Sequence, residues 1–276
     1  AFVGVPTMSW DLLESPDFDK RDTSSLVSVG GGGAPAPAEL VRRVDKGFKQ
    51  GKPQIGYGMT ETNAYGPGNS GADYLRKPTS SGRAVPVMQV QVVDDDGNPV
   101  PTGEVGEICF RGPNMIRGYW NKPEATAQTL RGGWVHTGDM GRMDADGYLT
   151  FIGRFKEMIK VSGYSVFPEE VETLLIRHPD IAAAAVIGVP DATKGEVVKA
   201  VIVPRPGAPA DLSAEAIIAW SRENMSAYKV PRFIEFIDAL PKTATEKIEK
   251  YKLKQDALSR RATLWDRERE GIAVRR

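Results

Sequence analysis

Residues 26–33 read Leu-Val-Ser-Val-Gly-Gly-Gly-Gly, a mostly apolar run that ends in four glycines. The run predicts a short strand, and the glycines let the backbone approach a flat or phosphorylated ligand closely. Leu40, Val44 and Phe48 then recur at helical spacing, which predicts a helix over 37–48. A strand, a loop and a helix in this order indicate an α/β layer with its ligand at the carboxyl ends of the strands.

The pattern of apolar and polar residues changes towards the middle of the chain. Residues 87–93 alternate between apolar and polar side chains and run into a turn cluster at 94–98, and residues 106–112 form a second strand-like run. A further Asp-Gly turn at 144–147 precedes a third run at 148–152. Short strands joined by such turns predict a small antiparallel sheet or barrel. We therefore expect an α/β part over residues 1–95, followed by a small β-barrel subdomain over 96–154.

A compact α+β unit is expected over residues 155–276. Its helix at 168–175 opens with proline and acidic residues, which the positive end of the helix dipole favours. A second helix is expected over 213–225, with Ser213 as its N-cap. The strands that we expect in this unit lie at 181–189, 197–203 and 233–237.

The composition excludes several classes of protein. The 276 residues are 41% hydrophobic and 26% charged, which is ordinary for a globular protein. Thirty-six basic side chains balance 36 acidic ones, so the chain lacks the excess of positive charge expected of a nucleic-acid binder. The longest apolar stretch is too short to span a membrane. The single cysteine, Cys109, cannot form an internal disulfide and suits a reducing compartment, so we expect a cytoplasmic protein.

Several polar clusters could carry chemistry, and each also has a purely structural interpretation. Thr60 and Glu61 could bind phosphate and a divalent cation, or they could cap a helix. Asp139 follows a glycine and suits a ribose diol, although it could equally cap a turn. His136 and His178 are far apart in the sequence, and we expect structural roles for both.

The order of these segments resembles that of one family, the adenylate-forming superfamily of acyl- and aryl-CoA synthetases, luciferases and peptide-synthetase adenylation domains. The resemblance covers nearly the whole chain, and the branch that it favours is that of the fatty-acyl-CoA synthetases. The matching segments are Gly32-Gly33-Ala34-Pro35, Tyr57-Gly58-Met59-Thr60-Glu61, Gly133-Trp134-Val135-His136-Thr137-Gly138-Asp139, Gly153-Arg154-Phe155-Lys156, Ile159-Lys160-Val161-Ser162-Gly163-Tyr164 and residues 241–247.

The resemblance implies a ligase that joins a carboxylic acid, of fatty or related type, to CoA through an acyl-AMP made from ATP. It also implies a large domain followed by a small, mobile C-terminal domain. The roles that it implies are adenine binding by Gly32, Gly33, Ala34 and Tyr57, phosphate binding by Thr60, Mg²⁺ binding by Glu61, ribose binding by Asp139 and Arg154, adenylation chemistry by Lys247, a hinge at Lys156, and a thioester-forming face at Lys160 and Gly163.

Two departures from the family pattern qualify this expectation. Glu246 stands where the family usually has glycine before the adenylation lysine, so adenylation could be slowed or unaffected. The family's phosphate loop has no counterpart here, so we expect a fragment that holds the C-terminal half of a synthetase. A silent binding or folding unit, or a ligase that loads a carrier protein, are the alternatives. A truncated large domain could also self-associate.

Overall fold

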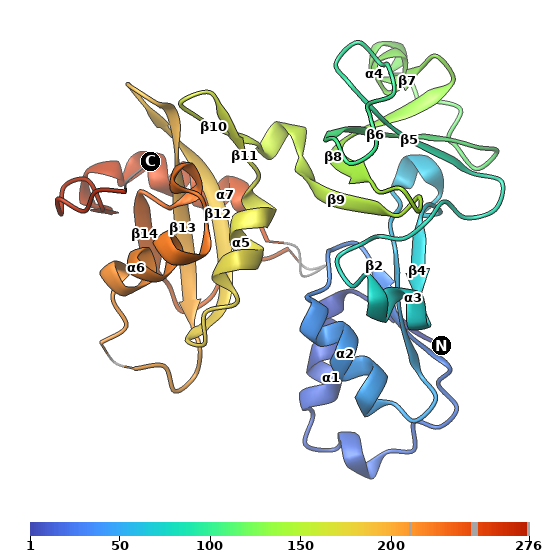
Figure 1. The fold of residues 1–276 in the computed structure, drawn as a ribbon, viewed down its shortest axis with the longest axis horizontal. Helices are drawn as coiled ribbons and strands as arrows, with labels where there is room; N and C mark the ends of the chain where they lie inside the picture. Colours follow the sequence, from blue (N-terminus) through green and yellow to red (C-terminus); the bar gives the residue numbers. More distant parts are fainter. Residues whose placement is uncertain (210, 244–247, 275–276) are drawn as a thin grey trace. The chain divides into compact units, whose positions relative to one another are not determined.

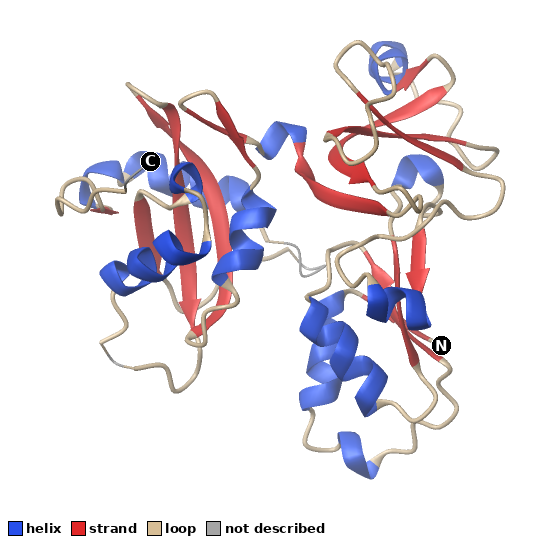
Figure 2. Ribbon diagram, viewed as in Figure 1, coloured by secondary structure: helices blue, strands red, loops and turns tan. Residues whose placement is uncertain are grey.

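A computed structural model describes residues 1–209, 211–243 and 248–274. The chain folds as two compact units, Ala1–Ile152 and Gly153–Arg276. Figure 1 shows both units, and Figure 2 shows that each combines helices with strands. The mixed α/β and α+β class expected from the sequence is therefore confirmed.

The first unit begins with a four-stranded sheet in the order β1-β2-β3-β4. Strands β1, β2 and β3 are parallel, whereas β4 is antiparallel to β3. Helices α1 and α2 pack on this sheet through the apolar cluster around Val29 and Leu40. The elements of this part are β1 (Phe2–Gly4), α1 (Pro6–Glu14), η1 (Phe18–Lys20), β2 (Ser28–Gly32), α2 (Ala38–Gly47), β3 (Lys52–Gly56), η2 (Thr60–Thr62), β4 (Gly68–Ser70) and α3 (Gly71–Arg76).

The remainder of the first unit is a five-stranded sheet. Strand β6 pairs antiparallel with β5 and β8, β7 pairs antiparallel with β8, and β9 also pairs with β8. Ile108, Phe110 and Leu149 are almost completely buried in its core. Its elements are β5 (Gln89–Val93), β6 (Gly106–Arg111), α4 (Pro123–Thr129), β7 (Leu130–Arg131), β8 (Trp134–Met143) and β9 (Leu149–Arg154), the last of which runs into the second unit.

The second unit is built around β13, which pairs antiparallel with β12 and parallel with β14. Ser213 caps α6 as expected, because its side chain accepts a hydrogen bond from the amide of Ala216. The elements are η3 (Phe155–Glu157), β10 (Ile159–Val161), β11 (Tyr164–Val166), α5 (Pro168–Leu175), β12 (Ile181–Asp191), β13 (Gly195–Pro204), α6 (Ala214–Asn224), η4 (Ala227–Lys229), β14 (Phe233–Phe236), α7 (Lys250–Ser259), η5 (Arg261–Thr263) and β15 (Trp265–Asp266).

Apolar side chains on both faces of the β12–β13 hairpin explain its continuous hydrophobic sequence. Val186 belongs to a cluster with residues of α5 and α6, whereas its neighbours Ala185 and Ile187 belong to a cluster with Leu253 and Ala257 of α7. Because successive side chains of a strand point to opposite faces, the hairpin is covered by helices on both sides. The unit therefore has three layers, with α5 and α6 on one face and α7 on the other.

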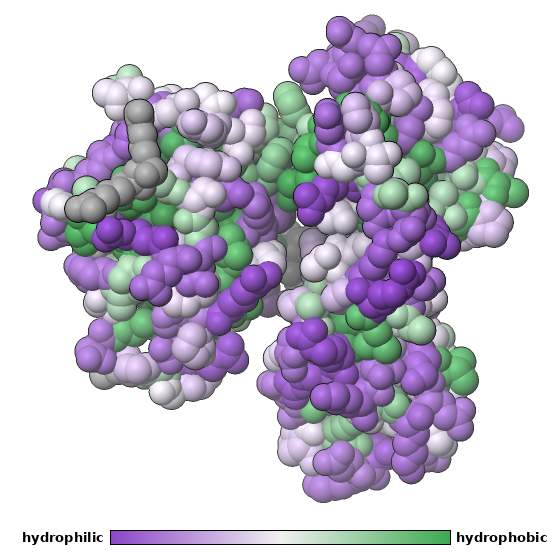
Figure 3. Space-filling view, in the orientation of Figure 1, coloured by the Kyte–Doolittle hydropathy of each residue, from purple (hydrophilic) through white to green (hydrophobic). Residues whose placement is uncertain are grey.

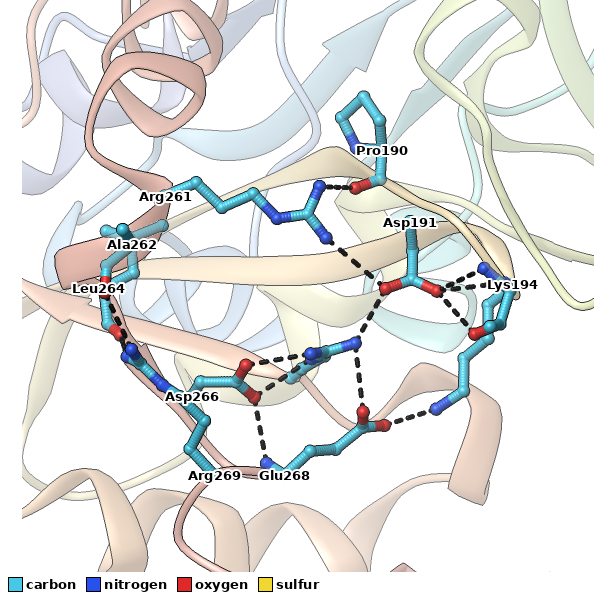
Figure 4. Close-up of polar contacts among 11 residues, drawn as sticks. Pro190, Asp191, Lys194, Arg261, Ala262, Leu264, Asp266, Glu268 and Arg269 are labelled. Carbon is cyan, nitrogen blue, oxygen red and sulfur yellow. Dashed lines mark hydrogen bonds and ion pairs between the residues drawn. The ribbon is translucent and has the colours of Figure 1, made fainter.

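A network of ion pairs fixes the C-terminal segment to this sheet (Figure 4). The guanidinium of Arg232 donates two hydrogen bonds to Asp266, at 3.0 and 2.9 Å, and a third to Asp191 at 2.7 Å. It also forms an ion pair with Glu268. Burial by itself would raise the pKa of Asp191, but hydrogen bonds from Thr193 and neighbouring amides, together with Arg232, lower it to about 2.

Polar residues cover most of the face drawn in Figure 3, and apolar residues lie in patches between them. No helix among the described residues is both long enough and apolar enough to cross a membrane.

Candidate functional site

Two segments at one edge of the first sheet carry six of the twelve predicted site residues. Gly32 is the last residue of β2, and Tyr57 follows β3 directly. Because β2 and β3 are parallel, with Gly32 opposite Gly56, both loops leave from the same carboxyl edge. A Cβ atom on Gly32 would lie 2.5 Å from the Gly56 carbonyl oxygen, so only glycine allows this close approach. Gly33 and Ala34 follow Gly32 and are exposed.

Tyr57 is the residue that links two of the predicted motifs. Its hydroxyl donates a hydrogen bond to the carboxylate of Asp139, with 2.5 Å between the oxygen atoms, although 82 positions separate the two residues. The tyrosine ring packs at centroid distances of 5.4 Å from Phe110 and 6.0 Å from Phe151. The structure thus brings an aromatic ring and a carboxylate together beside the carboxyl edge of the parallel strands.

Glu61 is also fixed by a tyrosine. The hydroxyl of Tyr119 donates to Glu61 Oε1, at 2.5 Å, and the Glu61 carbonyl oxygen accepts from the amide of Ile116. Burial, and then the hydrogen bond to Glu61, raise the pKa of Tyr119, so this phenol remains a donor. Thr60 is exposed, and the hydroxyl that bonds the start of the short helix is that of Thr62. The helix-cap alternative therefore applies to Thr62 and not to Thr60.

The loop that holds Thr60 and Glu61 is supported by an asparagine that the sequence analysis did not single out. Asn114 donates to the carbonyl oxygens of Thr62 and Tyr65, at 2.7 and 3.2 Å. A Cβ atom on Gly58 would lie 2.7 Å from the carbonyl carbon of Ala64, so glycine is required where the loop folds back. The contacts of Asn114 join residues 52 and 49 positions apart, so no local sequence pattern predicts them.

A second group escaped the sequence analysis, which treated His136 as isolated from other ligand-forming residues. Potential ligand atoms of Glu107, Cys109 and His136 all lie within 4.8 Å of one another. The three residues lie on the neighbouring strands β6 and β8, where Cys109 is directly opposite His136. Burial raises the pKa of the Cys109 thiol to about 12. The sequence analysis identified residues 106–112 as a strand-like run, but such a run cannot reveal which strand pairs with it.

The second unit carries the remaining predicted residues. Lys156 lies in η3 and is exposed, and the guanidinium of Arg154, two positions earlier, lies 3.4 Å from Glu157 Oε1. Lys160 donates to the hydroxyl of Ser165 at 2.8 Å. Gly163 has a φ of +87° in the turn between β10 and β11, and no atom lies within 4 Å of the position that a Cβ would take. Backbone geometry alone thus explains this glycine.

Lys247, the predicted adenylation lysine, lies outside the described residues. A bridge between Lys242 and Ile248 pairs the two ends of its segment. Lys250, at the start of α7, lies among three carboxylates: its Nζ atom is 2.8 Å from Glu172 and 3.5 Å from both Glu157 and Glu169.

Comparison with known proteins agrees with this arrangement. The model of a family described as AMP-binding enzyme matches residues 1–120, and that of the AMP-binding enzyme C-terminal domain matches residues 170–247. A feruloyl-CoA synthase from Amycolatopsis sp is 44% identical over 253 residues, which are 90% of this chain and 50% of that protein. A long-chain-fatty-acid–CoA ligase from Escherichia coli O6:H1 is 38% identical over 263 residues, or 93% of this chain and 45% of the ligase.

Among solved structures, the amide bond synthetase McbA from Marinactinospora thermotolerans has a TM-score of 0.84 and 38% identity, and the match covers 91% of this chain and 50% of McbA. The fold and the two successive matches define a member of the adenylate-forming enzymes. This chain belongs to the AMP-binding enzyme family and contains the C-terminal domain of that family. It spans about half the length of the relatives that it matches.

Proposed function

We propose that the chain supplies the adenosine-binding half of an AMP-forming acid–thiol ligase. The observation that supports this most directly is the hydrogen bond between Tyr57 and Asp139. A flat ring suits a purine base, and a carboxylate can accept hydrogen bonds from both hydroxyls of a ribose. Gly32, Gly33 and Ala34 would line the base from the neighbouring loop.

The other polar residues receive their roles from the same family pattern. Thr60 would contact phosphate, and Arg154 would provide the second ribose contact. Lys156 would be the hinge about which the C-terminal domain turns between two half-reactions. After that turn, Lys160 and Gly163 would face the site during thioester formation.

The carboxylate of Glu61 fits Mg²⁺, which prefers oxygen ligands. The Tyr119 hydroxyl occupies Oε1, so Oε2 is the oxygen that would face the cation. When bound, the ion would neutralise part of the charge on the phosphates of ATP. Tyr119 would hold the carboxylate in place, because an oriented ligand loses less freedom on binding.

The proposed reaction has two steps that use this chain's residues differently. A carboxylate oxygen of the acid attacks the α-phosphorus of ATP, which forms acyl-AMP and releases pyrophosphate. Lys247 would stabilise the negative charge that builds on the phosphate oxygens during this attack. The thiol sulfur of CoA then attacks the acyl carbon, the thiol loses its proton, and AMP leaves.

For the acid, we propose an aryl or fatty carboxylic acid, since relatives of both kinds match this chain. A thiol on a carrier protein is the alternative acceptor, and the amide bond synthetase makes an amine a further one to include. CoA and the buried Cys109 both favour a reducing compartment, so we propose the cytoplasm as the location.

The experiment that tests this proposal uses the 276-residue chain with Mg²⁺, ATP, CoA and a pooled set of acids that includes ferulate and long-chain fatty acids. AMP formation and the masses of new thioesters are measured. We expect the nucleotide to bind, and any thioester to identify the acid.

In the complete protein, Lys247→Ala should abolish adenylation but spare thioester formation from supplied acyl-AMP. Equal loss of both steps would contradict the role of Lys247.

A second candidate is a binding or folding unit without catalytic activity. The observation that favours it is that the chain spans only about half the length of its relatives. A rise in melting temperature with ATP but no AMP formation would support this candidate. Absence of any nucleotide effect on melting would contradict the adenosine site itself.

A further inference from the structure

The segment that carries Asp139 is a bulge in β8. Glu107 lies opposite Met140 and Cys109 opposite His136, so two positions along β6 correspond to four along β8. The additional residues lie between His136 and Met140, and Gly138 among them has a φ of +69°. A bulge unpairs residues from the ladder and can re-aim a side chain. Here it frees Asp139 from regular pairing.

Glu107 contacts both the start and the middle of this bulge. Its Oε1 atom accepts a hydrogen bond from the amide of Gly138 at 2.9 Å, and its Oε2 atom lies 2.7 Å from Nδ1 of His136. The guanidinium of Arg131 lies 3.3 Å from the same Oε2 atom and 2.7 Å from the same Nδ1 atom. The Glu107 side chain is only 22% exposed, so these contacts replace most of its contacts with water.

The bulge is closed on its other side by Thr137. Its hydroxyl donates to the carbonyl oxygen of Ile108 at 2.7 Å and accepts from the amide of Asp139 at 3.0 Å. The Asp139 carboxylate then reaches the hydroxyl of Tyr57. The hydrogen bond from the Gly138 amide thus connects Glu107 to Asp139 through the backbone of the bulge.

We propose that Glu107 is a positioning residue for ribose recognition, because it holds the bulge that sets the direction of the Asp139 carboxylate. This inference rests on the proposed function, in which Asp139 binds the ribose hydroxyls. A hydrogen bond from a backbone amide to an ionised carboxylate is stronger than one between neutral groups. Without Glu107, the amide of Gly138 loses its acceptor and the bulge can adopt other conformations.

The side chains of Glu107, Cys109 and His136 could instead hold a metal such as zinc, which accepts oxygen, nitrogen and sulfur ligands. One observation favours the positioning role: Arg131 places a positive charge 2.7 Å from the nitrogen atom that would bind the metal.

The test compares two nucleotides on the 276-residue chain: AMP and 2′,3′-dideoxy-AMP, which lacks both ribose hydroxyls. Dissociation constants are measured by calorimetry for the unsubstituted chain and for Glu107→Ala, Glu107→Gln and Asp139→Ala. Glu104→Ala is the matched control, because Glu104 is exposed in the turn before β6. Circular dichroism and melting confirm that each variant is folded.

We expect the unsubstituted chain and Glu104→Ala to prefer AMP. Glu107→Ala should reduce that preference about tenfold, which corresponds to one lost hydrogen bond with a charged group. Glu107→Gln should retain most of it, because its amide oxygen can still accept from Gly138. A purely structural effect would weaken the binding of both nucleotides equally and leave the preference for AMP unchanged.

Three outcomes would overturn the inference in distinguishable ways. If Asp139→Ala loses the preference but Glu107→Ala keeps it, the positioning role fails while the proposed function stands. If the unsubstituted chain shows no preference, the ribose assignment of Asp139 fails and the inference fails with it. If the chain binds one Zn²⁺ that is lost in both Glu107→Ala and Cys109→Ser, the cluster is a metal site.

Discussion

Replacing Lys250 by methionine is the perturbation that most directly tests how the second unit is held together. The methionine keeps much of the apolar volume but removes the positive charge that lies close to all three of Glu157, Glu169 and Glu172. The Lys250 side chain is 20% exposed, and that of Glu172 is 14% exposed. Removing one member of such a buried group leaves the remaining charges uncompensated.

The distances set the expected loss of stability. With an effective dielectric constant of about 20, unit charges 2.8 Å apart attract each other by about 6 kcal/mol, and those 3.5 Å apart by about 5 kcal/mol. Repulsion among the carboxylates and the cost of burying Lys250 offset much of this attraction. The carboxyls can also take up protons once the lysine is gone. We therefore expect the free energy of unfolding to fall by about 3 kcal/mol, at the lower end for a broken buried pair.

The loss should also depend on pH. Burial raises the pKa values of Glu169 and Glu172, and Lys250 partly counteracts that rise. A raised pKa in the folded state favours folding below the unfolded value of 4.5, and this contribution is lost as the pH rises through the folded value. Without Lys250 the two pKa values rise further. The difference between variant and unsubstituted chain should therefore be larger at pH 8 than at pH 5.

Native-state hydrogen exchange of the full chain measures this free energy in peptides that cover β12 and β13. Lys252→Met is the control on the same helix: the Lys252 side chain is 52% exposed and pairs with Glu249, so we expect little change. A Lys250→Met variant as stable as Lys252→Met, or a loss that grows towards pH 5, would contradict a stabilising role for the Lys250 charge.

Two further predictions concern single polar contacts. Tyr119→Phe removes the hydroxyl that donates to Glu61, and we expect Mn²⁺, used in electron paramagnetic resonance as a probe for Mg²⁺, to bind about tenfold more weakly. Unchanged binding would contradict the role of Tyr119 in orienting the Glu61 carboxylate. Asp191→Asn should destabilise the chain at pH 7 but have little effect near pH 2. The reason is that the lowered pKa of Asp191 contributes stability above pH 3.8, which is lost as the pH falls to about 2. Urea titrations at the two pH values measure this difference, and an equal effect at both would show that the charge of Asp191 does not cause it.

The sequence predicted the elements whose burial follows a regular period. The helix over 37–48 was expected from Leu40 and Val44, which are buried in α2 as that period requires. Helices α1 and α4 were not predicted, because the buried residues of α1 are limited to Ser9 and α4 buries none of its residues. Such helices have no apolar stripe that a periodic pattern could reveal.

The candidate site was predictable where a motif lies on one continuous segment. Tyr57 and Asp139 were both named from their motifs, but their contact depends on the pairing of separate strands. Glu107 and Asn114 were not named at all, because they act on loops that are distant in the sequence. Support of this kind depends on strand register and on a bulge, neither of which composition or spacing encodes.

The carboxylate of Glu172 has a consequence for association between molecules. Its Oε1 atom accepts a hydrogen bond from the amide of Val186, in the middle of β12, at 2.7 Å. Within the described part of the chain, β13 is the only strand that pairs with β12, so the opposite side of β12 is a sheet edge. Unpaired amides on such an edge invite a strand from another molecule. Because Glu172 already accepts from the Val186 amide, a strand of another molecule cannot use that amide. Glu172 thus opposes the addition of another strand to β12, the longest of the described strands.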